Sequence, residues 1–380
     1  MVKVLHLITW LNRGGIERWL LTMLGEMSRD ECQMDVCCRG SEAGELAAEA
    51  RALGSNVSVC PLQLDHVRFG RQLAQLLRDG QYDVLHNHLG VYSGYPTWIG
   101  HQVGVPVITQ FHNAHCAPQA WTKRPVLREL RGVYARYSVR YALRHSDLIV
   151  GISQGLFGEL EQVWGETGHN SRVVYYGVDI PDLPAEQDRA AFRRSLNWDD
   201  DVPVAIHVGS FRQEKNHRGL LQLFRQVVER MPQAKLLLVG DGPLRPEIEA
   251  MVSAHGIGQS VRLLGLRDDV PALLGYSDVM IMPSLTEGFG LAALEANAAG
   301  LAVVGSRIPG LSEAVADGET ALLHDVEDLC GMCDSVVALL SDPARAGLMG
   351  RAGRRRADAE FSKRAAAGRL LEVYHECLRR

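Results

Sequence analysis

Short apolar runs alternate with amphipathic segments along the whole chain, and this alternation limits the possible folds more than any other feature. The runs include VKVLHLIT, YDVLHNH and DLIVGIS in the first half, and VPVAIHVGS, AKLLLVGDG and DVMIMPS in the second. Helix-like segments at 16–27, 70–77 and 220–229 lie between such runs. Near-continuous Val, Ile and Leu strands that alternate with helices are typical of parallel sheets covered on both faces. The sequence therefore predicts an α/β fold with doubly wound parallel sheets.

The alternation occurs twice, on either side of a segment rich in proline and charge. A chain of 380 residues, 46% of them hydrophobic, is too long for one ordinary core and fits two domains. Pro181 and Pro184 mark a linker at about 179–188. We expect one Rossmann-like domain over residues 1–180 and another over 189–360. Ligands of such folds bind beyond the carboxyl ends of the strands, so the expected site is the cleft between the two facing domains.

The composition argues against several classes of protein. A net charge of −5 argues against nucleic acid as a partner. No stretch approaches the roughly 20 apolar residues that a membrane-spanning helix needs, and the first run is strand-like with no cleavage site after it. The eight cysteines fit reduced thiols. Together these features predict a cytoplasmic protein.

Two glycines, Gly14 and Gly15, follow the first run in LNRGGIERW and open a helix. They let the backbone approach a ligand, and the helix start offers free N–H groups to an anion. A plain turn is the alternative. The dinucleotide fingerprint G-x-G-x-x-G is missing from this segment, which argues against a nicotinamide site here.

Histidines end two runs of the first half. His86 and His88 lie in YDVLHNH, and His112 is followed by Asn113 in PVITQFHN. At strand ends we expect these side chains to hydrogen-bond a sugar or an acceptor. The His-x-His spacing also suits a metal ion, but no carboxylate or cysteine partner is near in sequence, so we expect no metal. For His86 and His88 a structural role within the sheet is the alternative.

A cationic pair follows the first strand of the second half. Arg212 and Lys215 lie in GSFRQEKN, after Ser210 and before a helix. Fixed positive charge at a helix N-terminus suits a diphosphate, whereas a solvated surface turn is the alternative. The next two strands also end in turns at the same edge, which points to one extended ligand. These turns contain Gly240, Leu266 and Arg267.

The fourth strand of this half leads into PSLTEGFGLAALEANAAG, which holds two glutamates at a spacing of eight. Glu287 lies in a glycine-rich loop and Glu295 on the helix that follows, so both can reach one ligand. A carboxylate that accepts two neighbouring hydroxyls suits a sugar or a ribose. The pair could instead be the acid and base of a glycoside hydrolase, but the surroundings are those of a phosphate site. The loop and helix start consist of Gly288, Phe289, Gly290 and Leu291.

With these motifs in place, nearly the whole chain resembles the retaining glycosyltransferases of the GT-B fold, in glycosyltransferase family 4 (group 1). HVGSFRQEKN, LVGDGP and the E-x7-E element carry the resemblance in the second half, and GGIE in the first. The resemblance implies the GT-B fold, with a C-terminal helix at 361–380 that crosses back to the first domain.

The resemblance also implies roles for matching positions. Arg212 and Lys215 resemble the residues that hold the diphosphate of the donor and stabilise it as it leaves. Glu287 resembles the residue near the donor sugar, and Glu295 resembles the ribose-binding glutamate.

Two positions in the first half also match the family pattern, and two positions in the second half differ from it. Gly15 resembles the residue whose backbone meets the phosphate, and His112 resembles the histidine that contacts the donor sugar near the reacting carbon. Asn297 stands where the family often has an apolar residue, and Ala302 where it often has proline. Both departures are compatible with the fold.

The expected reaction is transfer of a hexosyl unit from a nucleotide sugar, most simply a UDP-sugar, to a glycan, a lipid-linked molecule or a small molecule. The resemblance implies retention of the anomeric configuration, no metal and no cofactor. Alternatives are a nucleotide-sugar epimerase or a phosphorylase of the same fold. An alternative of another class is a catalytically silent nucleotide-sugar-binding partner.

The segment 121–144 has seven Lys or Arg residues, one Glu, and interleaved aromatic residues. Basic amphipathic helices of this kind lie on anionic membrane surfaces, where a lipid-linked acceptor would be found. We therefore expect a peripheral contact with the inner face of the membrane. A solvated helix with paired arginines is the alternative.

Overall fold

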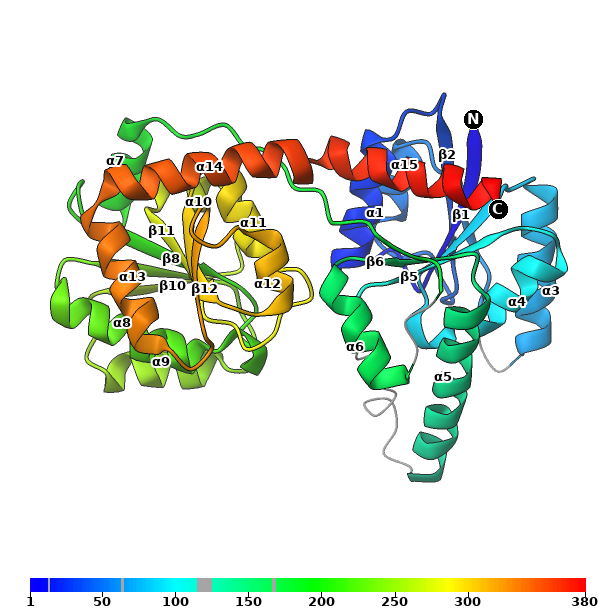
Figure 1. Ribbon diagram of the computed structural model, residues 1–380, viewed down its shortest axis with the longest axis horizontal. Coiled ribbons are helices and arrows are strands. Elements are labelled where there is room, and N and C mark those ends of the chain that lie inside the picture. The colour runs from blue at the N-terminus through cyan, green and yellow to red at the C-terminus, as the bar shows by residue number, and fades with distance from the viewer. Residues whose placement is uncertain (13, 63–64, 115–124, 166–168) are drawn as a thin grey trace. The chain divides into compact units, whose positions relative to one another are not determined.

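The computed structural model describes residues 1–12, 14–62, 65–114, 125–165 and 169–380, with side chains from residue 129 onward in the helix that begins at Pro125. The chain forms two units, one of 1–177 with 363–380 and one of 178–362 (Figure 1). Each contains one parallel sheet, of seven strands in unit 1 and six in unit 2. The prediction of two doubly wound parallel-sheet domains is confirmed.

The sheet of unit 1 has the order β3-β2-β1-β4-β5-β6-β7, so β1 lies between β2 and β4. Because β1 is buried on both faces, its alternate residues belong to two cores. Val4 packs toward α1 and α15, whereas Leu5 packs toward α3 and α4. The strands are β1 (Val2–Ile8), β2 (Cys32–Cys38), β3 (Val57–Val59), β4 (Val84–Asn87), β5 (Val107–Phe111), β6 (Leu148–Gly151) and β7 (Ser171–Val173).

Two helices of unit 1 start at a side chain that caps them, and α1 starts at a glycine. Asp65 caps α3 by accepting from the Arg68 N–H at 2.8 Å, and Ser153 caps α6 in the same way. The bounds are α1 (Gly15–Glu26), α2 (Ala47–Ala52), α3 (His66–Asp79), η1 (Gly90–Tyr92), α4 (Gly94–Gln102), α5 (Pro125–His145), α6 (Gln154–Trp164) and α15 (Lys363–Arg379).

The sheet of unit 2 has the order β10-β9-β8-β11-β12-β13, and its main core lies between these strands and α8, α9, α13 and α14. The strands are β8 (Val204–Val208), β9 (Lys235–Val239), β10 (Val261–Gly265), β11 (Val279–Met282), β12 (Ala302–Ser306) and β13 (Ala321–His324). The helices are α7 (Glu186–Ser195), η3 (Gln213–Lys215), α8 (His217–Arg230), α9 (Arg245–Ala254), α10 (Val270–Tyr276), α11 (Leu291–Ala298), α12 (Pro309–Ala314), α13 (Leu329–Ser341) and α14 (Pro343–Phe361).

The chain passes between the units twice, and the two passing segments lie side by side. Val178 donates its N–H to the Phe361 carbonyl at 2.9 Å and pairs with Ser362 in a parallel bridge. Gly177 is required at this crossing because a Cβ there would lie 2.6 Å from the Cα of Lys363. The helix expected at 361–380 is α15, which begins only after Ser362 has adopted an extended conformation.

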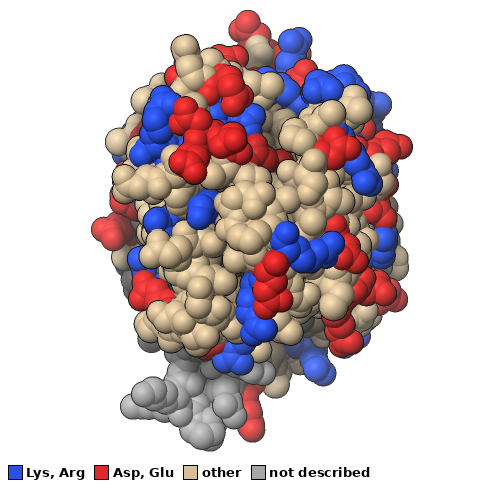
Figure 2. All heavy atoms as spheres, turned by 90° about the vertical axis from the view of Figure 1, so that its left-hand side faces the viewer, with Lys and Arg blue, Asp and Glu red and all other residues tan. Residues whose placement is uncertain are grey.

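The described helices include none with the length and hydropathy that spanning a bilayer requires. Figure 2 shows both Lys or Arg and Asp or Glu side chains on the visible face.

Candidate active site

In unit 2, the turn after β8 and the loop after β11 meet in an ion pair. Lys215 donates to both carboxylate oxygens of Glu287, at 2.6 and 2.7 Å, and the Ser284 hydroxyl donates to Oε1 at 2.7 Å. The Lys215 and Glu287 side chains are only 18% and 9% exposed, so the pair is largely shielded from solvent. The sequence predicted both residues at the site, but neither their contact nor the part played by Ser284.

Asn216 holds these two segments together. Its backbone is in the left-handed region, with φ at 52°, which ends η3 and starts α8. Its side chain caps α8 through the Gly219 N–H at 3.1 Å and donates to the Pro283 carbonyl at 3.0 Å. Asparagine can adopt a positive φ angle and can also cap a helix. An Asn directly before a helix in the sequence therefore indicates such a cap.

Arg212 lies at the start of the same turn and remains exposed. Its side chain forms no ion pair with the described residues, whereas Lys215 is held by Glu287. The two cations that the sequence placed together therefore differ in the ligand-free protein: one guanidinium reaches into solvent and one ammonium is neutralised. Ser210 lies beside Arg212, whose N–H donates to the Ser210 carbonyl at 2.8 Å.

The loop between Glu287 and α11 depends on close backbone packing. Gly290 has a φ of 64° and starts α11, a conformation that a side chain would strain. A Cβ on Gly310, at the start of α12, would lie 2.2 Å from the Glu287 carbonyl oxygen. The Phe289 ring is buried and packs near Phe361, so this residue can present only its backbone, as Gly288 and Leu291 can, to an anion.

Glu295 projects from α11 and is mostly buried. Burial, with a smaller contribution from the charge of Asp179, raises the pKa of its carboxyl to about 7. No hydrogen bond to this carboxylate forms within the described residues. Glu295 is thus a partly protonated acceptor that gains from hydroxyl groups brought by a ligand, and it does not share the Lys215 partner of Glu287.

The other two turns at this edge have local explanations. A Cβ on Gly240, whose φ is 134°, would lie 2.0 Å from the Gly209 carbonyl oxygen, so packing alone requires glycine. Arg267 is bidentate with Asp269 at 2.7 and 2.6 Å, while Leu266 is 80% exposed. To contact a ligand, the Arg267 guanidinium would have to leave Asp269.

In unit 1, five side chains form a continuous chain of hydrogen bonds: one from within β1, three from segments that follow strands, and one from α15. Tyr374 of α15 bonds His6 Nε2 at 3.1 Å, and His6 Nδ1 bonds His88 Nε2 at 3.0 Å. His88 Nδ1 bonds His112 Nε2 at 3.0 Å, and His112 Nδ1 bonds the Tyr176 hydroxyl at 2.7 Å. We call this series the imidazole chain.

Burial lowers the pKa of His6 and of His112 to about 3 and moves that of His88 well below its usual range. The rings of the imidazole chain are therefore neutral at pH 7, and each has one donor and one acceptor nitrogen. Because each ring bonds through both nitrogens, the tautomer of one fixes the tautomer of the next. The orientation of the His112 ring thus depends on residues as distant in sequence as Tyr374.

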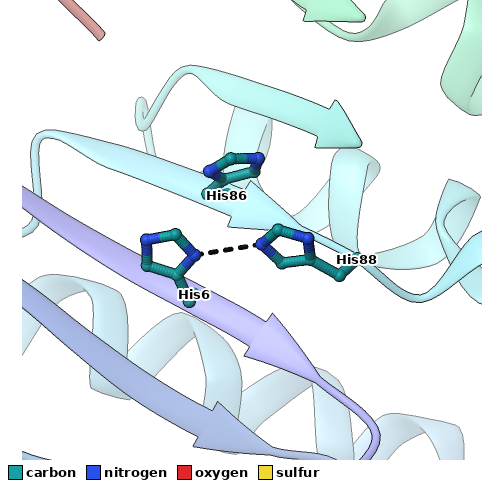
Figure 3. A group of neighbouring side chains, drawn as sticks. All are labelled: His6, His86 and His88. Carbon is teal, nitrogen blue, oxygen red and sulfur yellow. Dashed lines mark hydrogen bonds between the residues drawn. The ribbon is translucent and has the colours of Figure 1, made fainter. Parts of the chain in front are cut away.

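His86 lies beside this chain (Figure 3); its ring stacks on that of His88 and is tilted against that of His6. Candidate ligand nitrogens of the three rings lie within 4.8 Å of one another. However, the ring planes deviate by only 12–36° from parallel, and the facing nitrogens of His6 and His88 bond each other. Lone pairs lie in the ring planes, so near-parallel rings direct them along separate planes and not at one ion. The geometry favours a hydrogen-bonded stack.

The predicted site residues of unit 1 therefore differ in their access to a ligand. His86 is fully buried and bonds Tyr374 at 3.0 Å. It therefore has the structural role that was the alternative, and the expected contact with an acceptor is wrong for this residue. His88 is 7% exposed, and both of its nitrogens are bonded. His112 has two bonded nitrogens as well, while Asn113 is exposed. Sequence analysis missed His6, although a histidine inside the apolar run VKVLHLIT was a signal.

Gly14 and Gly15 begin α1 in different surroundings. A Cβ on Gly14 would lie 2.3 Å from the Glu17 carboxylate, which folds back over the helix start. A Cβ on Gly15 would meet no atom within 4 Å. The protein itself therefore leaves the backbone open at Gly15 and covers it at Gly14 with the side chain of Glu17.

The departure at Asn297 has a structural explanation. Its side chain is buried and donates to the Leu301 carbonyl at 2.9 Å and to the Thr320 carbonyl at 3.3 Å. It thus connects α11 to the residues that directly precede β12 and β13.

Two family models match the chain. "Glycosyltransferase Family 4" matches residues 13–181, and "Glycosyl transferases group 1" matches residues 188–356. Among curated relatives, N-acetyl-alpha-D-glucosaminyl L-malate synthase of Bacillus anthracis is 27% identical over 81% of this chain and 78% of its own length. D-inositol 3-phosphate glycosyltransferase of Corynebacterium efficiens is 26% identical over 96% of this chain and 90% of its own.

Solved structures share the fold. The Anabaena protein HepE, crystallised with UDP, superposes with a TM-score of 0.82 at 20% identity, over 98% of this chain and all of its own. Sucrose-phosphate synthase of Thermosynechococcus elongatus superposes with a TM-score of 0.74 at 21% identity, over 99% of each chain. The two matched models, the relatives and the paired parallel-sheet units agree: the chain belongs to the group 1, family 4 glycosyltransferases and has the GT-B fold.

Proposed function

We propose that this glycosyltransferase transfers a hexosyl unit from a UDP-sugar to an acceptor, with retention of configuration and without a metal ion. The observation that carries the proposal is the arrangement of Lys215, Glu287 and Ser284 beside the exposed Arg212. A nucleoside diphosphate develops negative charge on its phosphate oxygens as it leaves. Preorganised cations and helix-start N–H groups stabilise such charge most effectively where solvent is restricted.

We infer that Lys215 exchanges its partner Glu287 for the donor diphosphate when the donor binds. In the ligand-free protein its ammonium is bound to Glu287, so the donor diphosphate must share or take over that cation. Glu287 keeps the Ser284 hydroxyl as a partner and is then free to accept a hydroxyl of the donor sugar. Attack and departure on the same face of the sugar need no protein nucleophile, and the proposed side chains act by binding and by charge.

Known relatives support the choice of donor. HepE structures have been determined with UDP, with UDP and glucose, and with UDP-glucose. The proposed acceptor of the ribose hydroxyls is Glu295, and the support for this role is that its buried carboxylate lacks a hydrogen-bond partner within the described residues. Two curated relatives are named for acceptors that are small anions, L-malate and an inositol phosphate, and this bears on the acceptor considered below.

Release of nucleoside diphosphate from UDP-, GDP-, ADP- and TDP-sugars, measured without acceptor, tests the donor. Wild type should release diphosphate slowly from one donor, and Glu287→Ala should lose about a hundredfold in rate if its contact forms in the transition state. Glu319→Ala, which removes an exposed carboxylate from the same unit, serves as the matched control. The anomeric configuration of the released sugar, determined by NMR, tests retention.

Three outcomes would contradict parts of the proposal. Binding of a UDP-sugar without turnover, even with acceptors present, would favour a silent binding partner. Conversion of the donor into another sugar nucleotide would favour an epimerase. An unaffected rate in Glu287→Ala would remove this glutamate from the site.

We further propose that the enzyme works in the cytoplasm at the inner face of the membrane, through α5. Leu130, Val133 and Tyr137 are 61%, 55% and 74% exposed and lie on one face of this helix, near Arg136. The remainder of the predicted segment, residues 121–124, lies outside the described residues. Free thiols at the described cysteines are compatible with a reducing compartment.

A further inference from the structure

Arg39, the first residue after β2, is a half-buried cation that has no anionic partner among the residues the structure describes. Its Nε is buried and has no hydrogen-bond partner among the described residues. No described carboxylate pairs with its guanidinium, whose carbon lies 4.2 Å from the centroid of the Tyr92 ring. Burial lowers the pKa of Arg39, although an arginine remains charged at neutral pH.

Another buried arginine of this protein shows what a structural role looks like. Arg193 is 4% exposed, bonds the Asp278 carboxylate at 3.0 and 3.2 Å, and donates to the Val202 carbonyl at 3.1 Å. Partial burial of a charge costs free energy unless a partner offsets it. Among the described residues no carboxylate offsets the burial of Arg39, and contact with the Tyr92 ring offsets it only in part. An anion from outside the folded chain would supply the missing partner.

The backbone places Arg39 at the edge of the sheet where ligands bind. Its N–H donates to the carbonyl of Ile8, the last residue of β1, and its carbonyl accepts from the Leu62 N–H, both at 2.9 Å. Tyr92 comes from η1, which follows β4 at the same edge. In open parallel sheets this carboxyl edge is the binding edge.

The surroundings orient the guanidinium. The Tyr92 ring covers one face of the planar group, and the N–H donors lie in the plane of that group. Tyr134 of α5 packs against Tyr92, with ring centroids 5.9 Å apart, and holds that ring in place. A guanidinium fixed in this way offers two parallel donors, which match the oxygens of a carboxylate or a phosphate.

We propose that Arg39, stacked on Tyr92, is a binding site for an oxyanion of the acceptor, so that the acceptor is a molecule that carries a carboxylate or a phosphate group. This assignment rests on the proposed function, because the anion can be part of an acceptor only if the protein is a transferase. It assigns the anion to unit 1, apart from Arg212 and Lys215, which serve the donor diphosphate in unit 2.

Binding of small anions tests the site directly. Inorganic phosphate and succinate are titrated into the whole protein by NMR, at constant ionic strength set with sodium chloride, because screening alone changes weak anion binding. We expect wild type to bind one of them, with shifts at amides near Arg39, and the preferred anion separates a phosphate from a carboxylate acceptor. Arg39→Gln should weaken that binding about tenfold or more, since hydrogen bonds to charged groups are lost.

Two further variants keep the test specific. Arg39→Lys retains the charge without the planar fork and should give an intermediate loss. Arg78→Gln removes an exposed arginine from the end of α3 and should bind the anion as wild type does. Thermal unfolding of each variant shows whether it folds.

The donor supplies the last comparison. Arg39→Gln should leave UDP affinity and donor hydrolysis within about twofold of wild type, as expected for a site that contacts only the acceptor. Absence of anion binding by wild type, equal binding by wild type and Arg39→Gln, or loss of UDP affinity in that variant would overturn the inference. If donor turnover is missing while anion binding still depends on Arg39, the proposed function fails and the anion site stands.

Discussion

At the scale of single residues, side chains that follow strands were predictable and their partners were not. The sequence could place Lys215 and Glu287 after strands, and Glu295 on the next helix, because parallel strands deliver their C-terminal residues to one edge; their roles stay predictions. The bond between Lys215 and Glu287 joins residues 72 positions apart and depends on how Asn216 connects the two segments. The raised pKa of Glu295 likewise depends on burial, which spacing along the chain does not reveal.

Glu295 should make both stability and donor binding depend on pH. Its pKa of about 7 lies above the ordinary 4.5, so between these values the folded protein holds a proton that the unfolded chain releases. The contribution of Glu295 to stability therefore falls as pH rises from 4.5 to 7. Glu295→Gln should raise the Tm of the ligand-free protein at pH 8 and change it little at pH 4.5.

Donor binding should show the opposite trend, because a ribose needs the ionised carboxylate as an acceptor. Wild-type affinity for UDP-glucose, which does not titrate in this range, should fall about tenfold from pH 8 to pH 6, a consequence of protonating one group with a pKa near 7. Glu295→Gln should bind weakly with a flat profile, and Glu319→Gln should follow wild type. If affinity changed with pH in the same way for all three proteins, Glu295 would not be the group that binds the ribose.

At the scale of elements, the quoted apolar runs coincide with inner strands such as β1, β4, β8 and β11, because a buried parallel strand has to be apolar on both faces. Helix positions were also close: the segment expected at 16–27 is α1, Gly15–Glu26. The break between α14 and α15 was not foreseen, since FSKRAAAG favours a helix throughout. Only the pairing of Ser362 with Val178, a tertiary contact, makes this residue extended.

Helix α5 carries a prediction about membranes. Arg136→Gln combined with Tyr137→Ser should weaken binding to vesicles of phosphatidylglycerol and phosphatidylcholine by about fivefold or more, because each basic residue near an anionic surface contributes about 1 kcal/mol. Co-sedimentation measures this, with Arg71→Gln and Arg78→Gln on α3 as a control of larger charge change. Equal sedimentation of wild type and the α5 variant would exclude α5 as the contact.

At the scale of the whole molecule, unit 1 is assembled from two separated parts of the chain, and its C-terminal part supplies a buried polar group. The Tyr374 hydroxyl of α15 bonds His6 and His86, at 3.1 and 3.0 Å, in the interior of the unit. Both histidines belong to the first half of the sequence. The imidazole chain that ends at His112 and Tyr176 is therefore complete only when α15 is docked.

Tyr374→Phe should destabilise unit 1 by about 1–3 kcal/mol, because it leaves buried imidazole nitrogens without a partner. Urea unfolding measures the loss, and hydrogen exchange of the β1 and β4 amides assigns it to unit 1. Tyr276→Phe in unit 2, which removes a hydroxyl with no hydrogen bond among the described residues, should change stability by less than about 0.5 kcal/mol. Equal effects of the two substitutions would mean that the hydroxyl of Tyr374 contributes little.

The separation of α15 from the rest of unit 1 also sets an order of events during synthesis on the ribosome. Residues 178–362 form a continuous unit that can fold as soon as it has emerged. Residues 1–177 emerge earlier but must wait through the translation of that entire unit before Tyr374 becomes available. The half of the protein made first is thus the half finished last, and its interior histidines remain open to water or to a chaperone for that time.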